Sequence, residues 1–428
     1  MLTGSIDFQK LLSSFCYKAK RLNNITQCNN MHPSKGIQYT KSRILEGKKI
    51  VLGITGSIAA VQSFELSREL MRHGADVHVV MTHDAEKFIT PTSMHFATGN
   101  EVTTEIDGRT QHVSFLGEYE GHADLLLISP CTSNTISKIA AGICDTSVTT
   151  MACVALGTEV PVMIVPAMNL AMYENPAVQK NVEFLKDAGV TFVGPKISGK
   201  KAKNADSKEI VEAVITKLGK NRLSGKKVLV IGGAAREMID DVRVISNISS
   251  GETALELALA AKRQGAETEL WHASMAVNVP SFINSKKFSS VNELIKMIPE
   301  GQAYDVILVP AALSDYAPLR QEGKISSDEE EITITLTKLP KVLPKLRKTA
   351  KFLAGFKAES TGGEELIKKA ETRMSENSLD MIIANNIHDV SEGKTKSAII
   401  FKDKIETFAG SKAELAGKII ERIAEHVE

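Results

Sequence analysis

Cysteine is scarce in this sequence. The 428 residues include five cysteines, none of them in a CxxC pair: Cys16, Cys28, Cys131, Cys144 and Cys153. An odd and sparse set of this kind argues against a disulfide framework and is typical of a reducing compartment. We therefore expect a cytoplasmic location.

Net charge is also low, and long apolar runs are nearly absent. Lysine and arginine number 52 against 51 for aspartate and glutamate, and the formal net charge of +1 argues against a nucleic-acid partner. Only residues 151–172 approach the length of a membrane span, and they contain Glu159, Pro161 and Pro166. We therefore predict a strand followed by a turn there, and no membrane association.

The remaining composition is that of a soluble globular protein, with 43% hydrophobic and 24% charged residues. A chain of 428 residues suggests two or three domains. The first thirty residues are polar and contain no long apolar segment, which argues against a signal peptide. We interpret residues 1–46 as a partly disordered N-terminal extension, with Met31 as an alternative start.

One sequence pattern occurs twice. Residues 47–56 read GKKIVLGITG, and residues 225–233 read GKKVLVIGG. Each combines a short β-branched run, typical of a buried strand, with a glycine turn that lets the backbone approach a phosphate. Two such turns predict two nucleotide- or cofactor-binding units on one chain.

Strand-like and helix-like segments alternate after the first repeat, which predicts a parallel, doubly wound α/β sheet. The first helix should carry Val61, Phe64 and Leu70 on one face. Residues 194–206 are predicted to form a Gly/Lys-rich loop, and a helix at 207–218 then completes a first domain at 47–218. The other expected strands are 50–55, 76–81, 124–129, 160–165 and 190–193, and the other expected helices are 58–72 and 133–141.

A second domain of the same class is expected at 226–428, after a linker at 219–225. It inserts residues 234–251 between its first strand and first helix, and long loops in compact domains usually serve function. The expected fold class is therefore α/β, with two Rossmann-like parallel-sheet domains in tandem. The expected strands are 227–231, 268–271, 305–309, 332–336, 352–356, 381–384 and 398–401, and the helices are 252–263 and 412–426.

Polar side chains follow several strands of the first domain, at the sheet edge where ligands of such folds bind. Ser57 alone is more often a plain helix N-cap than a phosphate contact, but the convergence favours a phosphate-bearing cofactor. The glycine turns match neither GxGxxG nor GxxxxGKS/T, so a nicotinamide or P-loop site is not favoured. The side chains concerned are Ser57, Thr82, Thr132, Asn134 and Thr135.

His112 and Asn169 are candidate reactive residues with ordinary alternatives. Histidine titrates near neutral pH and suits a general base, but a lone loop histidine is usually a surface residue. Asn169 follows a strand in the string VPAMN. It is either a turn residue or an amide aimed at a substrate carboxylate.

The inserted segment of the second domain is rich in hydrogen-bond donors. Residues 245–251 read ISNISSG just before a helix, which suits an anion but also ordinary helix capping. Asp315 follows a strand and Lys324 follows a glycine. A carboxylate for metal or base contact and a lysine for developing phosphate charge fit nucleotidyl chemistry, although such a lysine is most often a solvated surface charge.

Six strings in order carry a resemblance: GSIAA, SPCTSNTISKIAAG, VPAMNLAMY, ISNISSG, AALSDY and GKI. Together they resemble the bifunctional phosphopantothenoylcysteine decarboxylase/phosphopantothenate–cysteine ligase family of coenzyme A biosynthesis, over residues 47–428. The segment that runs from MHPSK to KSRILEGKKIVLG is similar to the archaeal branch. The resemblance implies two enzymes on one chain, a carboxy-lyase followed in sequence by an acid–amino-acid ligase.

For the first domain the resemblance implies an FMN-dependent decarboxylase that forms 4′-phosphopantetheine. His112 matches the family's active-site histidine, the expected proton acceptor. Asn169 matches the asparagine that holds the substrate carboxylate, and Met172 completes the motif. The positions implied to contact the flavin are Gly56, Ser57, Ile58, Thr82, Thr132, Asn134, Thr135 and Met168.

For the second domain the resemblance implies a ligase that activates 4′-phosphopantothenate as an acyl-nucleotide, which cysteine's amine then attacks. Asn247 matches the asparagine tied to the acyl intermediate, and Lys324 matches the lysine needed to form it. Mg²⁺ would bridge the nucleotide phosphates. The implied nucleotide-binding positions are Gly233, Pro310, Ala311, Asp315, Lys324, Phe356 and Arg373.

Three departures from the bacterial pattern affect these expectations. Residues 194–206 correspond to a bacterial flap but lack its cysteine. Lys324 is followed by Ile325-Ser326-Ser327 rather than by further lysines, so Arg373 is our candidate for part of the phosphate contact. The bacterial Asn-Pro-Asp-Ile segment is Leu339-Pro340-Lys341-Val342 here, which leaves CTP favoured over ATP but not fixed.

The resemblance also implies a homo-oligomer. Relatives place the flavin site between protomers of a trimer and pair their ligase domains as dimers, so His112 and Asn169 would serve one site from neighbouring chains. Two other functions are weighed against this one. A flavin-binding regulatory subunit is disfavoured by the presence of His112, Asn169 and a ligase half, and a nicotinamide-dependent oxidoreductase by the absent fingerprints.

Overall fold

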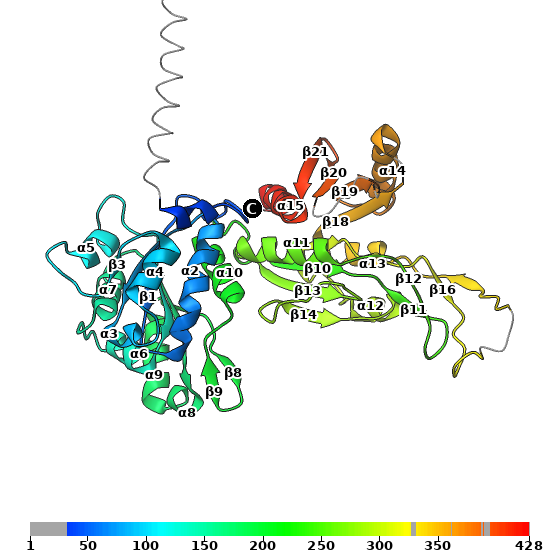
Figure 1. Cartoon of the computed structure of the whole chain (residues 1–428). Coiled ribbons are helices and arrows are strands. Elements are labelled where there is room, and N and C mark those ends of the chain that lie inside the picture. Colours follow the sequence, from blue (N-terminus) through cyan, green and yellow to red (C-terminus); the bar gives the residue numbers. More distant parts are fainter. Residues whose placement is uncertain (1–31, 327–330, 361, 387, 389–393, 428) are drawn as a thin grey trace, which may run out of the picture. The chain divides into compact units, whose positions relative to one another are not determined.

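The computed structural model describes residues 32–326, 331–360, 362–386, 388 and 394–427. The predictions for residues 1–30, including Cys16 and Cys28, lie outside these residues. The chain divides into two compact units, Met1–Leu218 and Gly219–Glu428. Figure 1 shows an open sheet with helices packed on it in each unit.

The first unit is built on a six-stranded parallel sheet in the order β3-β2-β1-β4-β5-β7. The glycine turn Gly56-Ser57 follows the central strand β1. Because all six strands run the same way, their carboxyl ends lie at one edge of the sheet. The strands are β1 Lys49–Ile54, β2 Asp76–Met81, β3 Val102–Thr103, β4 Leu125–Cys131, β5 Val162–Pro166 and β7 Thr191–Phe192.

Helices cover both faces of this sheet, because alternate residues of the buried strands point to opposite sides. Leu52 of β1 packs in a core with α2, α4 and α10, whereas its neighbour Val51 packs with α5, α6, α7 and α9. The helices of the two layers are α2 Ser63–Arg72, α4 Pro91–Thr98, α5 Gln111–Leu116, α6 Ser133–Ala140, α7 Ser147–Leu156, α9 Pro176–Asp187 and α10 Ser207–Leu218.

Shorter elements complete the first unit. A short ladder of three strands lies outside the main sheet, in the order β6-β9-β8. Short helices begin after the turns that follow β1, β2 and β6. These elements are η1 Pro33–Ile37, η2 Ile58–Gln62, α3 His83–Glu86, α8 Leu170–Tyr173, β6 Met168–Asn169, β8 Lys196–Ser198 and β9 Lys201–Lys203.

The second unit contains an eight-stranded sheet in the order β14-β13-β10-β15-β18-β19-β20-β21. Strands β14 to β19 are parallel, whereas β20 and β21 are antiparallel to their neighbours. The α/β fold class is confirmed, but this sheet is parallel only in part. The strands are β10 Lys227–Gly232, β13 Glu267–His272, β14 Asn284–Lys287, β15 Tyr304–Val309, β18 Ala350–Glu359, β19 Met381–Asn386, β20 Lys394–Phe401 and β21 Ile405–Ser411.

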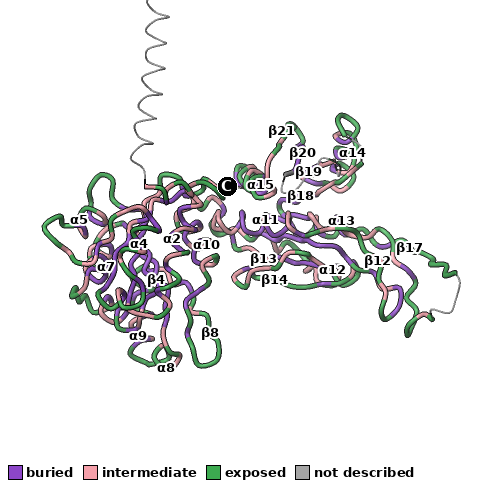
Figure 2. Tube along the Cα trace, viewed as in Figure 1, coloured by how far each residue is buried: buried purple, intermediate pink, exposed green. Residues whose placement is uncertain are grey.

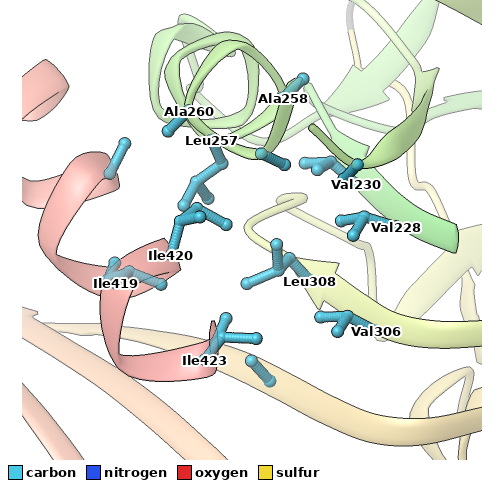
Figure 3. Close-up of a cluster of buried hydrophobic side chains, with 14 of the residues drawn as sticks. Val228, Val230, Leu257, Ala258, Ala260, Val306, Leu308, Ile419, Ile420 and Ile423 are labelled. Carbon is cyan, nitrogen blue, oxygen red and sulfur yellow. The ribbon is translucent and has the colours of Figure 1, made fainter. Parts of the chain in front are cut away.

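Two helical layers enclose this second sheet as well. Figure 3 shows Val228, Val230 and Leu308 of the sheet meeting Leu257 of α11 and Ile420 of α15. The opposite face packs against α12, α13 and α14. In Figure 2 the strands inside each unit are largely buried. The helices are α11 Glu252–Arg263, α12 Val291–Met297, α13 Leu343–Arg347, α14 Gly363–Glu376 and α15 Lys412–Val427.

Two short antiparallel ladders extend from the second unit's sheet: β11 with β12, and β16 with β17. They lie in the inserted loop after β10 and in the segment after β15. The predicted strand at 332–336 is wrong, because only Leu336 of that range is in a strand and Ile332 and Ile334 are exposed. These strands are β11 Arg236–Met238, β12 Val244–Ser246, β16 Tyr316–Pro318 and β17 Leu336–Lys338.

Residues 151–156 also differ from the prediction, since they belong to helix α7 and not to a strand. The helix begins with a capping box, in which Thr146 and Thr149 each accept the other's backbone N–H. Val148 and Met151 are fully buried beneath the sheet. Capping and tertiary packing therefore outweigh the strand-like composition of this segment.

The segment after β1 is also less regular than predicted. A 3₁₀ turn at Ile58–Gln62 precedes α2, so the expected single helix over 58–72 is divided. The side chain of Val61 falls outside the predicted apolar face and is 51% exposed, whereas Leu70 is fully buried. The change from 3.6 to 3 residues per turn rotates Val61 away from the core.

The described part of the N-terminal extension packs on the first unit. Leu45 is 1% exposed and belongs to the core beside α2. The backbone N–H of Lys41 donates to the carbonyl of Arg72 (3.1 Å), and the Lys41 ammonium pairs with Glu69. Residues 32–46 are thus part of the folded first unit rather than a disordered extension.

Candidate active sites

The turn after β1 is tied to the turn after β4. The hydroxyl of Thr55 donates to the carbonyl of Pro130 (2.8 Å) and accepts the backbone N–H of Thr132 (3.1 Å). At Gly56 an added Cβ would lie 2.5 Å from the Cβ of Asp84, so only glycine fits there. The turn after β1 and the turn after β4 therefore lie side by side at the carboxyl edge of the sheet.

Three of the four predicted flavin-contacting hydroxyls are helix caps, and the fourth, Thr135, lies in the first turn of α6. Ser57 accepts the N–H of Ala59, Thr82 that of Ala85, and Thr132 that of Thr135, each at 3.3 Å. A capping hydroxyl still has its own proton to donate, so it can cap a helix and bind an anion at once. The positive ends of these helices make the edge suitable for a phosphate.

A groove of about 920 Å³ opens at this edge. Ser57 and Ile58 line one side, and Met168 and Asn169 line another. The side-chain oxygen of Asn169 accepts the N–H of Ala171 (3.0 Å), which fixes the side chain at the start of α8. The structure therefore brings together four of the predicted site residues.

The predicted loop at 194–206 is a β-hairpin that forms the third wall of the groove. Strands β8 and β9 pair antiparallel, and β9 also pairs with β6. The buried Ala202 lies opposite Met168 in that register. Three lysines of the hairpin line the groove, Lys196, Lys201 and Lys203, and Asp206 beside them pairs with Lys196 at 2.6 Å.

Asn204 lines the same groove and was not identified from the sequence. It is 8% exposed, and its side-chain oxygen finds no hydrogen-bond partner within the described residues. Its amide nitrogen lies 3.4 Å from the side-chain oxygen of Gln62. An unpaired buried acceptor is costly, so it fits a ligand that brings an N–H group, as a flavin ring does.

His112 lies elsewhere in the first unit. It sits in the first turn of α5 rather than in a loop, after Thr110, whose φ of 50° is left-handed. Its Nδ1 atom is buried and has no hydrogen-bond partner in the part of the chain described. His112 does not line the groove that contains Asn169, and Figure 1 shows α5 well away from α8, β8 and β9.

Strands β10, β13 and β15 of the second unit are linked at their carboxyl ends. The N–H of Ala234 donates to Ser274, and the N–H of Ala312 donates to Gly233, both at 2.9 Å. Gly233 has a φ of 79°, and a Cβ there would lie 2.7 Å from the carbonyl oxygen of Ser274. The predicted positions Gly233, Pro310 and Ala311 thus meet at this edge.

Asp315 and Arg373 line one pocket of about 310 Å³. Lys341 lines it too and pairs with Asp315 at 2.7 Å. The hydrogen bond from Lys341 lowers the pKa of the Asp315 carboxyl against the opposing effect of burial. The Nε atom of Arg373 is buried without a partner among the described residues, which fits an incoming anion or carbonyl.

The other ligase candidates lie outside this pocket. Asn247 follows β12 and Lys324 lies in the loop after β16, and both are exposed. Phe356 is half-buried in β18 and packs against the core. Of the predicted ligase positions this pocket contains only Asp315 and Arg373, and it adds Lys341, which the sequence showed only as a departure from the bacterial segment.

The three described cysteines are not paired in disulfides. Cys131 is buried, which raises the pKa of its thiol, while Cys144 and Cys153 are free and exposed. Within the described residues, no group of three or more His, Cys, Asp or Glu side chains could hold a metal ion. A search of the same residues finds no helix that is both long and apolar enough to span a membrane.

These features define a class: a tandem α/β protein with a groove or pocket beside the strand ends of each sheet. The flavoprotein family model matches residues 38–219. The model of the DNA/pantothenate metabolism flavoprotein C-terminal domain matches residues 223–427.

Relatives match over nearly the full length. The coenzyme A biosynthesis bifunctional protein CoaBC of Thermococcus kodakarensis is 42% identical over 92% of this chain and 99% of its own. The protein of the same description from Methanocaldococcus jannaschii is 39% identical over 93% and 98%. A solved C-terminal domain of CoaBC is 28% identical over 48% of this chain and 98% of its own, with a TM-score of 0.41.

The chain therefore belongs to the family of coenzyme A biosynthesis bifunctional proteins. The predicted family is confirmed, and so is the prediction of a bifunctional decarboxylase and ligase.

Proposed function

We propose that this enzyme converts 4′-phosphopantothenate to 4′-phosphopantetheine in two steps. The second unit joins cysteine to 4′-phosphopantothenate through an acyl-nucleotide, and the first unit decarboxylates the product. The observation that supports this most strongly is the groove in the first unit. Its glycine turn suits the phosphate of a bound cofactor, and its fixed Asn169 amide and its lysines suit a substrate that carries a carboxylate.

The residues of the groove fit FMN. Ser57 of the groove, together with Thr132 on the turn tied to it through Thr55, would hold its phosphate, and the unpaired oxygen of Asn204 would accept an N–H of its ring. When bound, FMN supplies the oxidation and re-reduction that make loss of carbon dioxide possible.

Asn169 and the hairpin perform the protein's part of the decarboxylation. The Asn169 amide orients the substrate carboxylate, and the lysines of β8 and β9 balance its charge. His112 accepts the proton of the cysteinyl thiol as a general base. Since His112 and Asn169 lie apart in one chain, we propose that a trimer brings His112 to the groove of a neighbour.

In the second unit, Arg373 and Lys324 balance the charge that develops on the nucleotide phosphates. Asp315 contacts the nucleotide and Asn247 holds the acyl intermediate. Gly233, Pro310, Ala311 and Phe356 complete the proposed nucleotide site. Mg²⁺ bound with the nucleotide would supply positive charge to offset that of the phosphates. We propose CTP as the preferred nucleotide, a dimeric arrangement of this unit and a cytoplasmic location.

Flavin content tests the first half of this proposal. Purified protein is expected to be yellow and to release FMN on denaturation. A colourless protein that takes up no FMN when titrated with it would refute the assignment of the groove. The second half is tested by pyrophosphate release from CTP or ATP, which should require 4′-phosphopantothenate.

A further inference from the structure

The loop that carries Lys324 is held on both sides of that lysine by one turn. On one side, Gly323 and Asp241 exchange two hydrogen bonds: the N–H of Gly323 to the Asp241 carboxylate, and the N–H of Asp241 to the Gly323 carbonyl, both at 3.2 Å. On the other side, the N–H of Ile325 donates to Oδ2 of Asp240 (3.1 Å).

Asp240 is the centre of this contact. It is 0% exposed, although it lies in a turn whose neighbours Asp241 and Val242 are exposed. Its Oδ1 atom accepts the N–H groups of Val242 (2.7 Å) and Arg243 (2.6 Å) within the turn. Its Oδ2 atom faces outward from the turn and accepts from Ile325 and from the Arg243 guanidinium (2.7 Å).

The charge of Asp240 is maintained by these donors. Burial opposes ionisation, but the backbone N–H groups of Val242, Arg243 and Ile325 outweigh it, and the pKa of this carboxyl falls to about 2. The Arg243 guanidinium also donates to the carbonyl of Ile325 (3.1 Å), so carboxylate and guanidinium together bind both backbone polar groups of Ile325.

This turn also leads to the second candidate loop. Residues 239–243 run directly into β12, and Asn247 follows that strand. One buried carboxylate therefore lies between the segments that carry Asn247 and Lys324. The Lys324 side chain is exposed and flexible, so the position of its ammonium depends on how firmly its backbone is held.

We propose that Asp240 is a positioning residue of the ligase, which fixes the Lys324 loop so that the Lys324 ammonium meets the reacting phosphates. This inference rests on the proposed role of Lys324. It predicts that loss of the Asp240–Ile325 bond impairs acyl-nucleotide formation through Lys324 and not through unfolding.

Asp240→Asn tests the link with minimal change of shape. The remaining amide oxygen can still accept the two N–H groups of the turn. The new NH₂ group would face the Ile325 N–H and the Arg243 guanidinium, so donors would meet donors and the link to the Lys324 loop would be lost. Asp305→Asn is the matched control, because Asp305 also accepts a backbone N–H and a lysine but lies at the amino edge of the sheet.

The measurement is single-turnover formation of the acyl-nucleotide from 4′-phosphopantothenate and CTP or ATP, with the full chain and Mg²⁺. Asp240→Asn is expected to lower this rate about tenfold to a hundredfold, in line with the cost of a small misplacement. Asp305→Asn should leave it unchanged. Decarboxylation of added 4′-phosphopantothenoylcysteine by the same preparations reports that the first unit is intact.

A double-mutant cycle distinguishes positioning from a structural role. If Asp240 acts through Lys324, then Asp240→Asn does not lower the rate of acyl-nucleotide formation any further when Lys324 is already replaced by glutamine. An equal loss of rate in both backgrounds would overturn the proposal. If Lys324→Gln alone leaves the rate unchanged, the role of Lys324 fails, and this proposal fails with it.

Asp240→Ser serves where Asp240→Asn proves unstable. A serine hydroxyl can cap the same turn but has no second oxygen to reach Ile325. The expected result is again a slow ligase whose loss vanishes in the Lys324→Gln background. A ligase of normal rate in this variant contradicts the proposal.

Discussion

Asn169 pairs with Lys201 across the short antiparallel ladder between β6 and β9. Beside this pair, the N–H of Leu170 donates to the carbonyl of Lys200 (3.0 Å). The asparagine proposed to hold the substrate carboxylate is therefore attached to the hairpin that walls the groove. The hairpin and the asparagine should move together, so the docking of the hairpin sets the position of the amide.

Detaching the hairpin should slow decarboxylation alone. Ala202→Asp puts a charge at a position that is 1% exposed and faces Met168, which should undock β9 from β6. We expect the decarboxylation rate to fall by about tenfold or more, since a misplaced amide orients the carboxylate poorly. The ligase rate should not change. Lys200→Asp, at the exposed tip, is the control, and an equal loss there would contradict this account.

The turn after β1 should tolerate no side chain at position 56. In Gly56→Ala the new Cβ would lie 2.5 Å from the Cβ of Asp84, so the turn that carries Ser57 must shift. We expect the affinity for FMN to fall by about tenfold or more, the equivalent of about 1.4 kcal/mol. Fluorescence titration of the apoprotein with FMN measures this. Gly108→Ala is the control, because a Cβ there would meet nothing within 4 Å and, as at Gly56, φ is not left-handed.

His112→Asn should stop carbon dioxide release and leave the ligase intact. The substitution removes the proposed proton acceptor but keeps a polar side chain on α5. Carbon dioxide release and pyrophosphate release, measured on one preparation, separate the two activities. A parallel loss of both would mean that the two sites are not independent.

Mixtures of His112→Asn with Asn169→Ala test the shared site. If a neighbouring chain supplies His112, co-assembled variants form some sites with both native residues and regain part of the activity. The absence of any recovery in mixed oligomers would refute a site shared between chains.

Asn247→Asp should impair amide formation after the nucleotide has been transferred. The amide N–H groups that would hold the acyl intermediate are replaced by a carboxylate that repels its phosphate. We expect the acyl-nucleotide to accumulate, which mass analysis of quenched reactions detects. Normal formation of phosphopantothenoylcysteine in this variant would exclude the assigned role.

The stability of the second unit should depend on the charge of Asp240 at low pH. Its folded pKa of about 2 lies below the ordinary 3.8, so the charged form stabilises the fold. This contribution is complete above about pH 5 and is lost as the pH falls through 3.8 toward 2. The stability gap between the native chain and Asp240→Asn, measured by denaturant titration, should therefore narrow below about pH 4. A stability difference that stays constant down to pH 2 would contradict the stabilising role of the Asp240 charge.

Most regular elements could be predicted from sequence, because their patterns agree with their environment. Strand β2 and helices α10 and α11 begin and end where predicted. Each has an uninterrupted apolar pattern and a clear boundary signal, such as the Gly74 turn that ends α2 and precedes β2. The parallel strands also imply that their carboxyl ends meet, which is why Ser57 and Asn169 could be expected in one place.

Elements that depend on distant partners could not be predicted. Strand β21 alternates half-buried and exposed residues because it lies at the edge of its sheet, so its pattern resembles a loop. The hairpin at 196–203 is lysine-rich and depends on pairing with β6. Helix α7 has strand-like residues, and its capping box of two threonines lacks the usual acidic partner.

The sequence indicated the conspicuous site residues but not those that support them. Asn204, Lys341 and Asp240 occur in no motif that specifies a ligand. Their importance comes from burial, from an ion pair with Asp315, and from a hydrogen bond to a residue 85 positions away. These relationships exist only in the folded chain.

One coupled reaction tests the central claim most directly. The protein, loaded with FMN, is incubated with 4′-phosphopantothenate, cysteine, Mg²⁺ and either CTP or ATP, and the products are identified by mass. We predict 4′-phosphopantetheine, carbon dioxide, pyrophosphate and the nucleoside monophosphate, with CTP the better substrate. Recovery of unchanged 4′-phosphopantothenate with both nucleotides would contradict the account.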